Sequence, residues 1–413
     1  MAKVKSEKKR ITLLIWLCWL VYMCSYLGKV NYSANITQIE AFYGISHASA
    51  GMVGTFFFFA YGAGQIFNGV FCKKYNIKWM IFGALTVCGV CNLLVGLAPN
   101  FAIVKYVWLL NGLAMSVLWP TLIRLLSETL PRESMARASV VLGTTVATGT
   151  LIIYGLSALF AELQVFKLAF FLPAVVLPAV GVIWLCAFSP LTKIKAVPVE
   201  TEKREETAPQ EKGKMPRDLL RSICILAVFA VATNLVKDGL TTWVPSILKE
   251  NYGMPDSFSI LLTLLLPMVA VFGNFFAVQL HKKVSDFVLQ CGTVFLLAGV
   301  LVGGVIGLLS TKLVIVTLIG FALVNFLVSS SNSTITSIFP LFMKGKVNSG
   351  LIAGVLNGCC YVGSTISSYG LGALADSFGW NTVFYVLLAV CCAVVLTAAV
   401  YWLIGFLKRK KEK

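Results

Sequence analysis

The chain has 413 residues, of which 58% are hydrophobic and only 12% are charged, about half the charged fraction of a typical soluble domain. Long continuous apolar runs recur along its length, which excludes a soluble protein and favours a helical membrane protein over a β-barrel. The net charge of +17 does not indicate nucleic-acid binding, because the basic residues lie in short connections between the apolar runs.

Twelve apolar runs are long enough to cross a bilayer as helices. The first follows a basic start without a small-residue cleavage site, so we expect a retained helix rather than a signal peptide. The predicted spans are residues 11–36, 49–71, 78–98, 101–126, 136–161, 165–187, 219–248, 257–280, 286–309, 312–339, 347–374 and 379–407.

The sixth and seventh spans are separated by a polar segment of mixed charge, residues 188–218, which is typical of a linker. Six spans, a linker and six spans predict an all-α membrane protein of two pseudo-symmetric six-helix bundles, residues 1–187 and 219–413. Most of the 34 lysines and arginines lie at the two termini, in the linker and in alternate connections. The positive-inside rule therefore predicts a multi-pass protein of the cell membrane with both termini and the linker in the cytoplasm.

Cysteine and histidine are not expected to carry function. The twelve cysteines are scattered and mostly lie within apolar runs, so we interpret them as small buried hydrophobic residues rather than disulfides. The two histidines, His47 and His281, lie near loops and are expected to be surface residues. The spans contain no nucleophile–base pair and no set of metal ligands, so we expect neither an enzyme nor a cofactor.

The two halves repeat each other in sequence at a nearly constant offset. This offset indicates that the first, second and fifth spans repeat as the seventh, eighth and eleventh. Transporters built from such repeats bind their solute near the midplane, between the repeats. The matched positions are Lys29 with Lys237, Lys73-Lys74 with Lys282-Lys283, and Ala138–Gly143 with Ala353–Gly358.

Lys29 lies inside the first span and Lys237 inside the seventh. An ammonium in hydrocarbon costs roughly 3 kcal/mol, so it needs a partner, water or a function. Lys29 alone is close enough to the outer third of its helix to reach the interface, but the matched Lys237 argues against that explanation. We therefore predict that the two lysines face each other across a central cavity and hold an anionic solute.

Polar residues accompany each lysine at helical spacing. Asp238 follows Lys237 but projects about 100° around the helix, so the two need not pair. It is expected to balance charge or, less favoured, to bind a coupling proton. On the first span, the residues expected to share one face are Tyr22, Ser25, Tyr26, Lys29, Tyr32 and Ser33. The full predicted binding set is Lys29, Lys237, Tyr26, Tyr32, Ser25, Gln65, Trp119, Thr145, Asn234, Thr241, Asn274 and Tyr361.

Three further features predict structure rather than binding. Pro120 lacks an amide hydrogen and permits a kink in the fourth span. Arg124 and Glu128 are four residues apart and predict an ion pair. Glycines recur in the fifth and eleventh spans, which favours close helix crossing, at positions 143, 149, 354, 358 and 363.

Several motifs are similar to those of a known family. The loop from Gly69 to Lys78 resembles the Gly-x-x-x-Asp-Arg-x-Gly-x-Arg loop of the major facilitator superfamily, with Lys73 in place of the aspartate and Asn76 in place of the second glycine. A wider match resembles the organophosphate:phosphate antiporters and covers essentially the whole chain. It comprises Tyr26–Ala34, Tyr61-Gly62, Asn111-Gly112, Trp119-Pro120, Arg124 and Leu235–Leu248.

The resemblance implies phosphate binding through two arginines, at the positions where Lys29 and Lys237 stand. It also implies that Thr145 replaces a histidine and Gln65 a lysine. Lysine is a point charge without the planar fork with which arginine grips phosphate, so these exchanges alter the site. A phosphate ester is the first substrate class, and a monoanionic carboxylate or sulfonate remains open.

The expected function is secondary active transport of an organic anion, most readily a phosphate ester exchanged for inorganic phosphate, by rocker-switch alternating access. One alternative is proton- or sodium-coupled symport, which would use Asp238. Another is a non-transporting membrane sensor of an organic phosphate. The expected partners are a small anionic solute and the lipid bilayer, with no nucleic acid, and the protein is expected to be a monomer.

Overall fold

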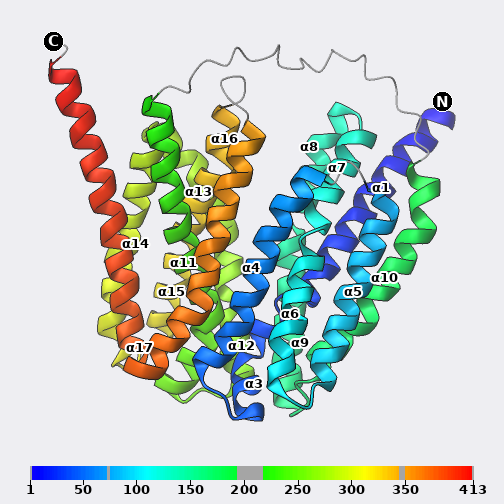
Figure 1. Ribbon diagram of the computed structural model, residues 1–413, viewed down its shortest axis with the longest axis horizontal. Helices are drawn as coiled ribbons and strands as arrows, with labels where there is room; N and C mark the ends of the chain where they lie inside the picture. The colour runs from blue at the N-terminus through cyan, green and yellow to red at the C-terminus, as the bar shows by residue number, and fades with distance from the viewer. Residues whose placement is uncertain (1, 72–74, 193–216, 344–348, 412–413) are drawn as a thin grey trace. The chain divides into compact units, whose positions relative to one another are not determined.

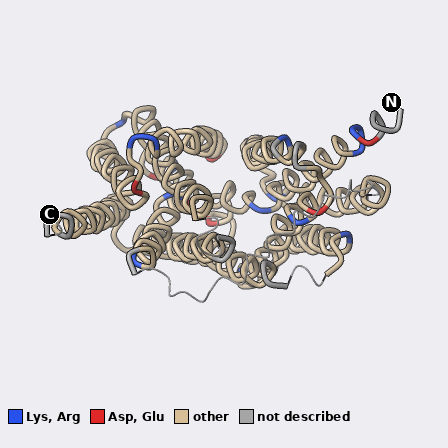
Figure 2. The backbone as a smooth tube through the Cα atoms, turned by 90° about the horizontal axis from the view of Figure 1, so that it is seen from above, with Lys and Arg blue, Asp and Glu red and all other residues tan. Residues whose placement is uncertain are grey.

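A computed structural model describes residues 2–71, 75–192, 217–343 and 349–411, and within these ranges the chain is helical and contains no strand (Figure 1). Most of the backbone belongs to residues without charge (Figure 2). Eleven helical segments in the described ranges are long and apolar enough to cross a membrane. The last of them, Ile352–Leu407, is interrupted at Gly379, where φ is 77°, so it supplies two spans. The predicted twelve-span helical fold is confirmed.

The chain forms two compact units. The first comprises Met1–Asn35 and Ala60–Lys214, and the second comprises Ile36–Phe59 and Met215–Lys413. Residues 36–59 follow the first span in the sequence, yet they belong to the second unit.

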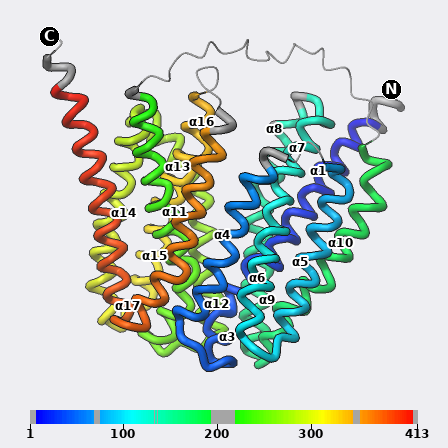
Figure 3. The backbone as a smooth tube through the Cα atoms, viewed as in Figure 1, coloured from blue at the N-terminus to red at the C-terminus, as the bar shows by residue number. Residues whose placement is uncertain are grey.

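In the first unit, α5 lies against α10, and α1 packs against α9 and α10 (Figure 3). Large buried side chains fill this core, among them Trp108, Tyr154, Phe170 and Trp184. The elements of this unit are α1 (Ala2–Leu27), α2 (Asn31–Ala34), the second half of α4 (His47–Phe71), α5 (Ile77–Leu97), α6 (Phe101–Met115), α7 (Leu118–Thr129), α8 (Arg132–Gly143), α9 (Thr145–Glu162) and α10 (Leu168–Thr192).

In the second unit, α11 packs along α17, and α13 and α14 pack against α15. The start of α11 and the end of α17 lie at one end of this unit, and α3, α12 and the turn at Gly379 lie at the other (Figure 1). The elements are α3 (Ile36–Tyr43), the first half of α4, α11 (Arg217–Tyr252), α12 (Asp256–Thr263), α13 (Leu265–Lys283), α14 (Phe287–Leu309), α15 (Val314–Ser333), the π-helical turn η2 (Thr334–Ile338), α16 (Phe339–Phe342) and α17 (Ser349–Lys411).

Short polar side chains cap the N-termini of several of these helices. Asn76 accepts a hydrogen bond from the Lys78 amide at the start of α5, and Asn100 accepts one from Ala102 at the start of α6. Asp286 accepts from two amides at the start of α14. Each side chain satisfies amides that have no partner within the helix, which fixes where the apolar run becomes helical.

Several predicted spans consist of two helices rather than one. The fourth breaks between α6 and α7 at Ser116, four residues before Pro120, where the proline ring clashes with a helical carbonyl. The kink expected from Pro120 is therefore present. The fifth span breaks at Thr144 and the eighth at Leu264.

Candidate functional site

The first span is interrupted next to Lys29. Helix α1 ends at Leu27 and α2 begins at Asn31, and the amides of Gly28 and Lys29 bond to carbonyls three residues earlier, both at 3.2 Å. The expectation of one continuous helical face from Tyr22 to Ser33 is therefore wrong.

Beyond the turn, Tyr32 is only 2% exposed, and its ring lies 5.6 Å from that of Trp108. Tyr32 therefore packs in the core of the first unit in this conformation.

Asparagine side chains hold this turn in place. The carbonyl of Gly28 accepts a hydrogen bond from Asn111 at 2.9 Å and another from Asn92 at 3.3 Å. Asn92 also accepts from Asn31 at 2.8 Å, which ties the start of α2 to α5. A Cβ atom on Gly28 would lie 2.7 Å from the Asn92 side-chain nitrogen, so a larger residue would displace the amide that holds the turn. The buried amides thus satisfy a carbonyl that the broken helix leaves open.

The ammonium of Lys29 lies against aromatic rings. Its Nζ is 4.1 Å from the ring centroid of Tyr61 on α4 and 5.1 Å from that of Tyr26 on α1. The faces of these rings carry partial negative charge and attract a cation, more strongly where water is excluded. Tyr26 was predicted at the site, whereas Tyr61 was not, although its residue pair with Gly62 belongs to the family resemblance.

The other predicted residues of the first unit are more dispersed. The Trp119 ring lies against that of Tyr22, tilted by 41°, with centroids 4.7 Å apart. The hydroxyls of Ser25 and Thr145 are buried and donate to carbonyls of the preceding helical turn, at 2.6 and 2.5 Å. Gln65 is half-buried, one helical turn after Tyr61 on α4. Their roles in binding remain predictions.

Lys237 lies in the middle of the uninterrupted helix α11, and its Nζ is 3.4 Å from a carboxylate oxygen of Asp238. Both side chains are half-buried, at 27% and 18% exposure. The other oxygen of Asp238 accepts a 2.5 Å hydrogen bond from Ser364 on α17 and a 3.3 Å bond from Asn234. Asp238 is therefore the counter-ion of Lys237 and also joins α11 to α17.

Two further predicted residues extend this polar layer to α15. The side-chain oxygen of Asn234 accepts from the Asn332 amide at 2.6 Å, and the Thr241 hydroxyl accepts from the Asn325 amide at 3.0 Å. Thr241 in turn donates to the carbonyl of Lys237 at 2.9 Å. Asn325 and Asn332 were missed, although an asparagine inside an apolar span is itself a signal, because a buried amide requires partners.

Tyr361 and Asn274 are the remaining predicted residues of the second unit. The Tyr361 ring lies 6.5 Å from that of Phe58, and Asn274 is exposed on α13. Their assignment to the site remains a prediction.

The two lysines have different surroundings, despite their matched positions in the repeat. Lys29 follows a helix break and rests on tyrosine rings, whereas Lys237 lies within a helix beside a carboxylate. The Lys237–Asp238 pair carries no net charge, so the second unit presents less positive charge than the repeat alone predicts.

Three other expectations can be compared with the structure. The Arg124–Glu128 ion pair is confirmed, with 2.8 Å between Nε and Oε1. The eleven cysteines of the described part are free, and most are buried or half-buried. The expectation of a surface position for His47 is wrong, because its side chain is only 16% exposed and hydrogen-bonds Glu40 at 2.8 Å.

The described residues form a polytopic helical protein with a lysine inside each unit, an architecture typical of helical membrane transporters. A profile of the Major Facilitator Superfamily matches residues 18–368, and the chain belongs to that family. The loop Gly69–Lys78, on which the family resemblance first rests, includes residues outside the described ranges.

Relatives and solved structures agree with this family. The chain is 20% identical over 403 residues to a probable hexose phosphate transport protein of Chlamydia pneumoniae, covering 91% of this chain and 87% of the relative. It is 23% identical over 394 residues to a probable sulfoacetate transporter of Cupriavidus necator, covering 91% and 90%. A bacterial homologue of the human lysosomal transporter Spinster, in an inward-facing and occupied conformation, shares the fold with a TM-score of 0.72 at 14% identity, over 95% of this chain and 96% of that one. The resemblance to the organophosphate:phosphate antiporters is thereby confirmed at low identity.

Proposed function

We propose that the protein is a secondary active transporter of an organic anion, with a phosphate ester exchanged for inorganic phosphate as the first substrate class. The observation that carries the proposal is the ammonium of Lys29, held on the faces of Tyr26 and Tyr61 within a membrane span. The ring faces attract a cation, and an ammonium has three N–H donors with which a bound anion can form hydrogen bonds. The full-length relative named as a probable hexose phosphate transport protein supports a phosphate ester.

The proposed mechanism is alternating access, in which Lys29 and Lys237 both contribute to binding the anion, as the sequence repeat predicts. Lys29 and Lys237 repel each other in one poorly hydrated site, less strongly than two bare cations because Asp238 pairs with Lys237, and an anion between them offsets the remaining repulsion. A solute that binds the closed state best shifts the equilibrium toward closure. Because the empty carrier closes less readily, it returns loaded with a second anion, which produces exchange.

A second candidate is a monoanionic carboxylate or sulfonate, carried by exchange or by proton- or sodium-coupled symport. The specific observation in its favour is the ion pair between Lys237 and Asp238, at 3.4 Å, which lowers the positive charge available to a dianion. The relative named as a probable sulfoacetate transporter supports this candidate.

Purified protein in proteoliposomes tests both candidates. Uptake of radiolabelled glycerol phosphate, hexose phosphate, a short sulfonate and a short carboxylate is measured with and without internal inorganic phosphate, and then with an imposed pH gradient. We expect phosphate-ester uptake that requires internal phosphate. Uptake of only the sulfonate or carboxylate, driven by the pH gradient, supports the second candidate instead.

Lys29→Gln and Lys237→Gln test the site itself. We expect each to reduce uptake at least tenfold, because each removes a charge of the anion site, while the protein remains folded and inserted. Lys312→Gln, which removes an exposed lysine between α14 and α15, is the matched control and should transport normally. Normal uptake by both Lys29→Gln and Lys237→Gln would disprove the assignment.

A further inference from the structure

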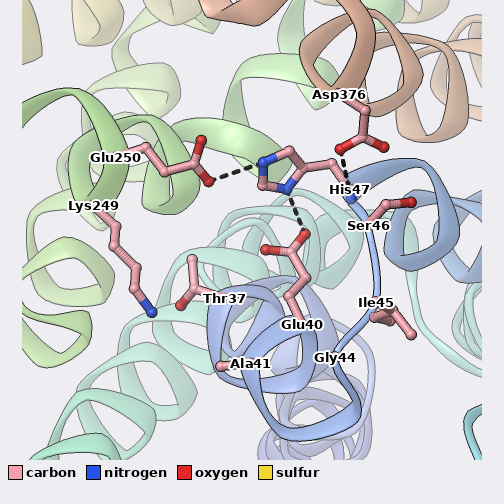
Figure 4. A pocket seen from close by; sticks show the side chains of 10 residues that line it. All are labelled: Thr37, Glu40, Ala41, Gly44, Ile45, Ser46, His47, Lys249, Glu250 and Asp376. Atoms are coloured by element: carbon pink, nitrogen blue, oxygen red, sulfur yellow. Dashed lines mark hydrogen bonds and ion pairs between the residues drawn. The ribbon is translucent and has the colours of Figure 1, made fainter.

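A cluster of ionisable groups that includes none of the predicted anion-site residues lies in the second unit (Figure 4). His47, at the start of α4, is its centre. Its Nδ1 is 2.8 Å from Glu40 on α3, and its Nε2 is 2.9 Å from Glu250 near the end of α11. The backbone amides of His47 and Ala48 donate to the carboxylate of Asp376 on α17, at 3.0 and 2.7 Å.

The chemistry of imidazole determines what this geometry requires. A neutral imidazole has one N–H donor and one lone pair, and an ionised carboxylate only accepts. Both ring nitrogens of His47 face carboxylate oxygens at hydrogen-bond distance, so a neutral ring between two carboxylates would leave a lone pair against an oxygen. The arrangement is satisfied when the ring carries one further proton, because both of its nitrogens then donate to the two carboxylates.

The groups around the His47 ring stabilise the additional proton. Glu40, Glu250 and Asp376 all face His47 from different helices, and the neighbouring Lys249 is engaged with Asp256 on α12 at 2.9 Å. Burial raises the pKa of the Glu40 carboxyl, although the hydrogen bond with His47 acts in the opposite direction.

Two tryptophans fix the position of the ring. Trp243 and Trp380 lie with ring centroids 5.5 and 5.2 Å from that of His47. Trp380 also donates to Glu250 at 2.8 Å, which holds that carboxylate toward the histidine. If the additional proton is lost, the imidazole therefore cannot rotate away from the unfavourable contact between its lone pair and a carboxylate oxygen.

The cluster is accessible to protons from water. It lines a pocket of about 310 Å³, and Glu250 is 42% exposed while His47 is 16% exposed. The pocket lies at the end of the unit that holds α3 and the turn at Gly379. The positive-inside prediction assigns this end to the outer side of the membrane.

We propose that His47, Glu40 and Glu250 form a proton-binding site whose occupancy fastens α3 and the start of α4 to α11 and α17. Residues 36–59 follow the first span and include the first half of α4, so release of this segment changes how the first span is joined to the second. Acid on that side stabilises the fastened state, and alkali weakens it. The inference does not depend on which solute the protein carries.

Histidine NMR tests proton binding directly, because the protein contains only two histidines. The His281→Gln variant leaves His47 as the single labelled imidazole, and His281 itself contacts Gln290, not a carboxylate, at 3.0 Å. We expect a doubly protonated His47 ring at neutral pH. Glu250→Gln should lower the midpoint of its titration by about one pH unit or more, because it removes a neighbouring negative charge. A singly protonated ring at pH 6 and above, or a midpoint that Glu250→Gln leaves unchanged, overturns the proposal.

Hydrogen–deuterium exchange tests the mechanical consequence. Protection of residues 36–59, corrected for the intrinsic pH dependence of exchange, should fall at least several-fold as the pH rises through the titration of the cluster. His47→Gln retains a donor group and an acceptor but cannot take up the proton, so its protection should be low and independent of pH. His281→Gln should behave as the wild type. Unchanged protection in α14 would show that His47→Gln is folded, and pH-independent protection in the wild type overturns the fastening role.

Discussion

Asp238 determines how much positive charge the second unit presents to a solute. Its carboxylate is 3.4 Å from Lys237 and is held by Ser364. Asp238→Asn keeps the shape and removes the charge. We expect the ratio of phosphate-ester to sulfonate uptake into proteoliposomes to rise about tenfold, since about 1.4 kcal/mol of electrostatic preference for the more highly charged anion corresponds to that factor.

Asp238→Glu, which preserves the charge, is the control and should leave the ratio near that of the wild type. If Asp238→Asn transports both anions in the original ratio, Asp238 does not set the charge of the site. Loss of uptake driven by a pH gradient, with the ratio unchanged, would instead assign the coupling proton to Asp238.

Single residues were partly predictable from the sequence. A lysine in an apolar run is conspicuous because an ammonium in hydrocarbon is energetically unfavourable, and Lys29 and Lys237 were found for that reason. Their partners were harder to find, because the asparagines that hold Gly28 lie more than sixty residues away in the sequence. His47 was misjudged because a histidine near a loop gives no sign of the carboxylates that other helices bring to it.

At the scale of helices, the atoms around each glycine show whether its helix crosses another closely or faces open space. A Cβ on Gly363 would lie 2.1 Å from the carbonyl oxygen of Val231, so α17 approaches the backbone of α11 there. A Cβ on Gly354, earlier on the same helix, would have no atom within 4 Å. Of the glycines predicted to permit close crossing, Gly363 does so and Gly354 does not.

The different surroundings of Gly363 and Gly354 predict different effects of replacing each of them with alanine. Gly363→Ala forces two backbones apart and should lower the thermal unfolding midpoint of the purified protein by several degrees, as overpacking costs about 1–3 kcal/mol. Gly354→Ala should leave the midpoint unchanged or raise it slightly, because alanine favours the helix. Equal effects of the two substitutions would contradict the close approach.

The spans were predictable and most of their interruptions were not. Hydropathy locates an apolar run whatever it packs against, so the twelve spans follow from the sequence. The break at Ser116 follows from Pro120. The break at Thr144 has no proline, and there the hydroxyls of Thr144 and Thr145 donate to carbonyls three residues earlier. Such local bonds compete with the helix, but the same residues also occur in unbroken helices.

At the scale of the whole molecule, residues 36–59 belong to the first half of the sequence but pack against helices of the second half. Their backbone approaches α17 closely, since a Cβ on Gly51 would lie 2.0 Å from the carbonyl oxygen of Ser368. Thr55 also donates to the carbonyl of Thr365 at 2.8 Å. A piece of chain that follows the first span therefore packs as part of the second unit.

Cutting the linker tests this arrangement. A protease site inserted near residue 205 divides the chain into two fragments, and we expect both to co-purify in detergent through an affinity tag on one, because residues 36–59 stay packed on α11 and α17. Uncut protein with the same insertion is the control. Complete separation of the fragments after cleavage, under conditions in which the uncut protein remains folded, would show that this packing is too weak to hold them.

The sequence repeat predicts two fused halves but does not reveal this packing. Matched offsets identify equivalent spans, whereas the partner of a connecting segment depends on contacts that span several hundred residues, such as His47 with Asp376. The family match likewise supports the overall architecture, and it gives no information about the cluster around His47.

The ion pair between Lys237 and Asp238 also bears on the response of the carrier to membrane voltage. A charge that crosses the full potential gains or loses about 2.3 kcal/mol per 100 mV. The pair is neutral and moves no net charge, whichever way the second unit turns. In the proposed site, Lys29 loaded with a monoanion is neutral as well, so the loaded step is electrically silent. A dianion would carry one negative charge through the field, and the cell's own potential would then favour its export.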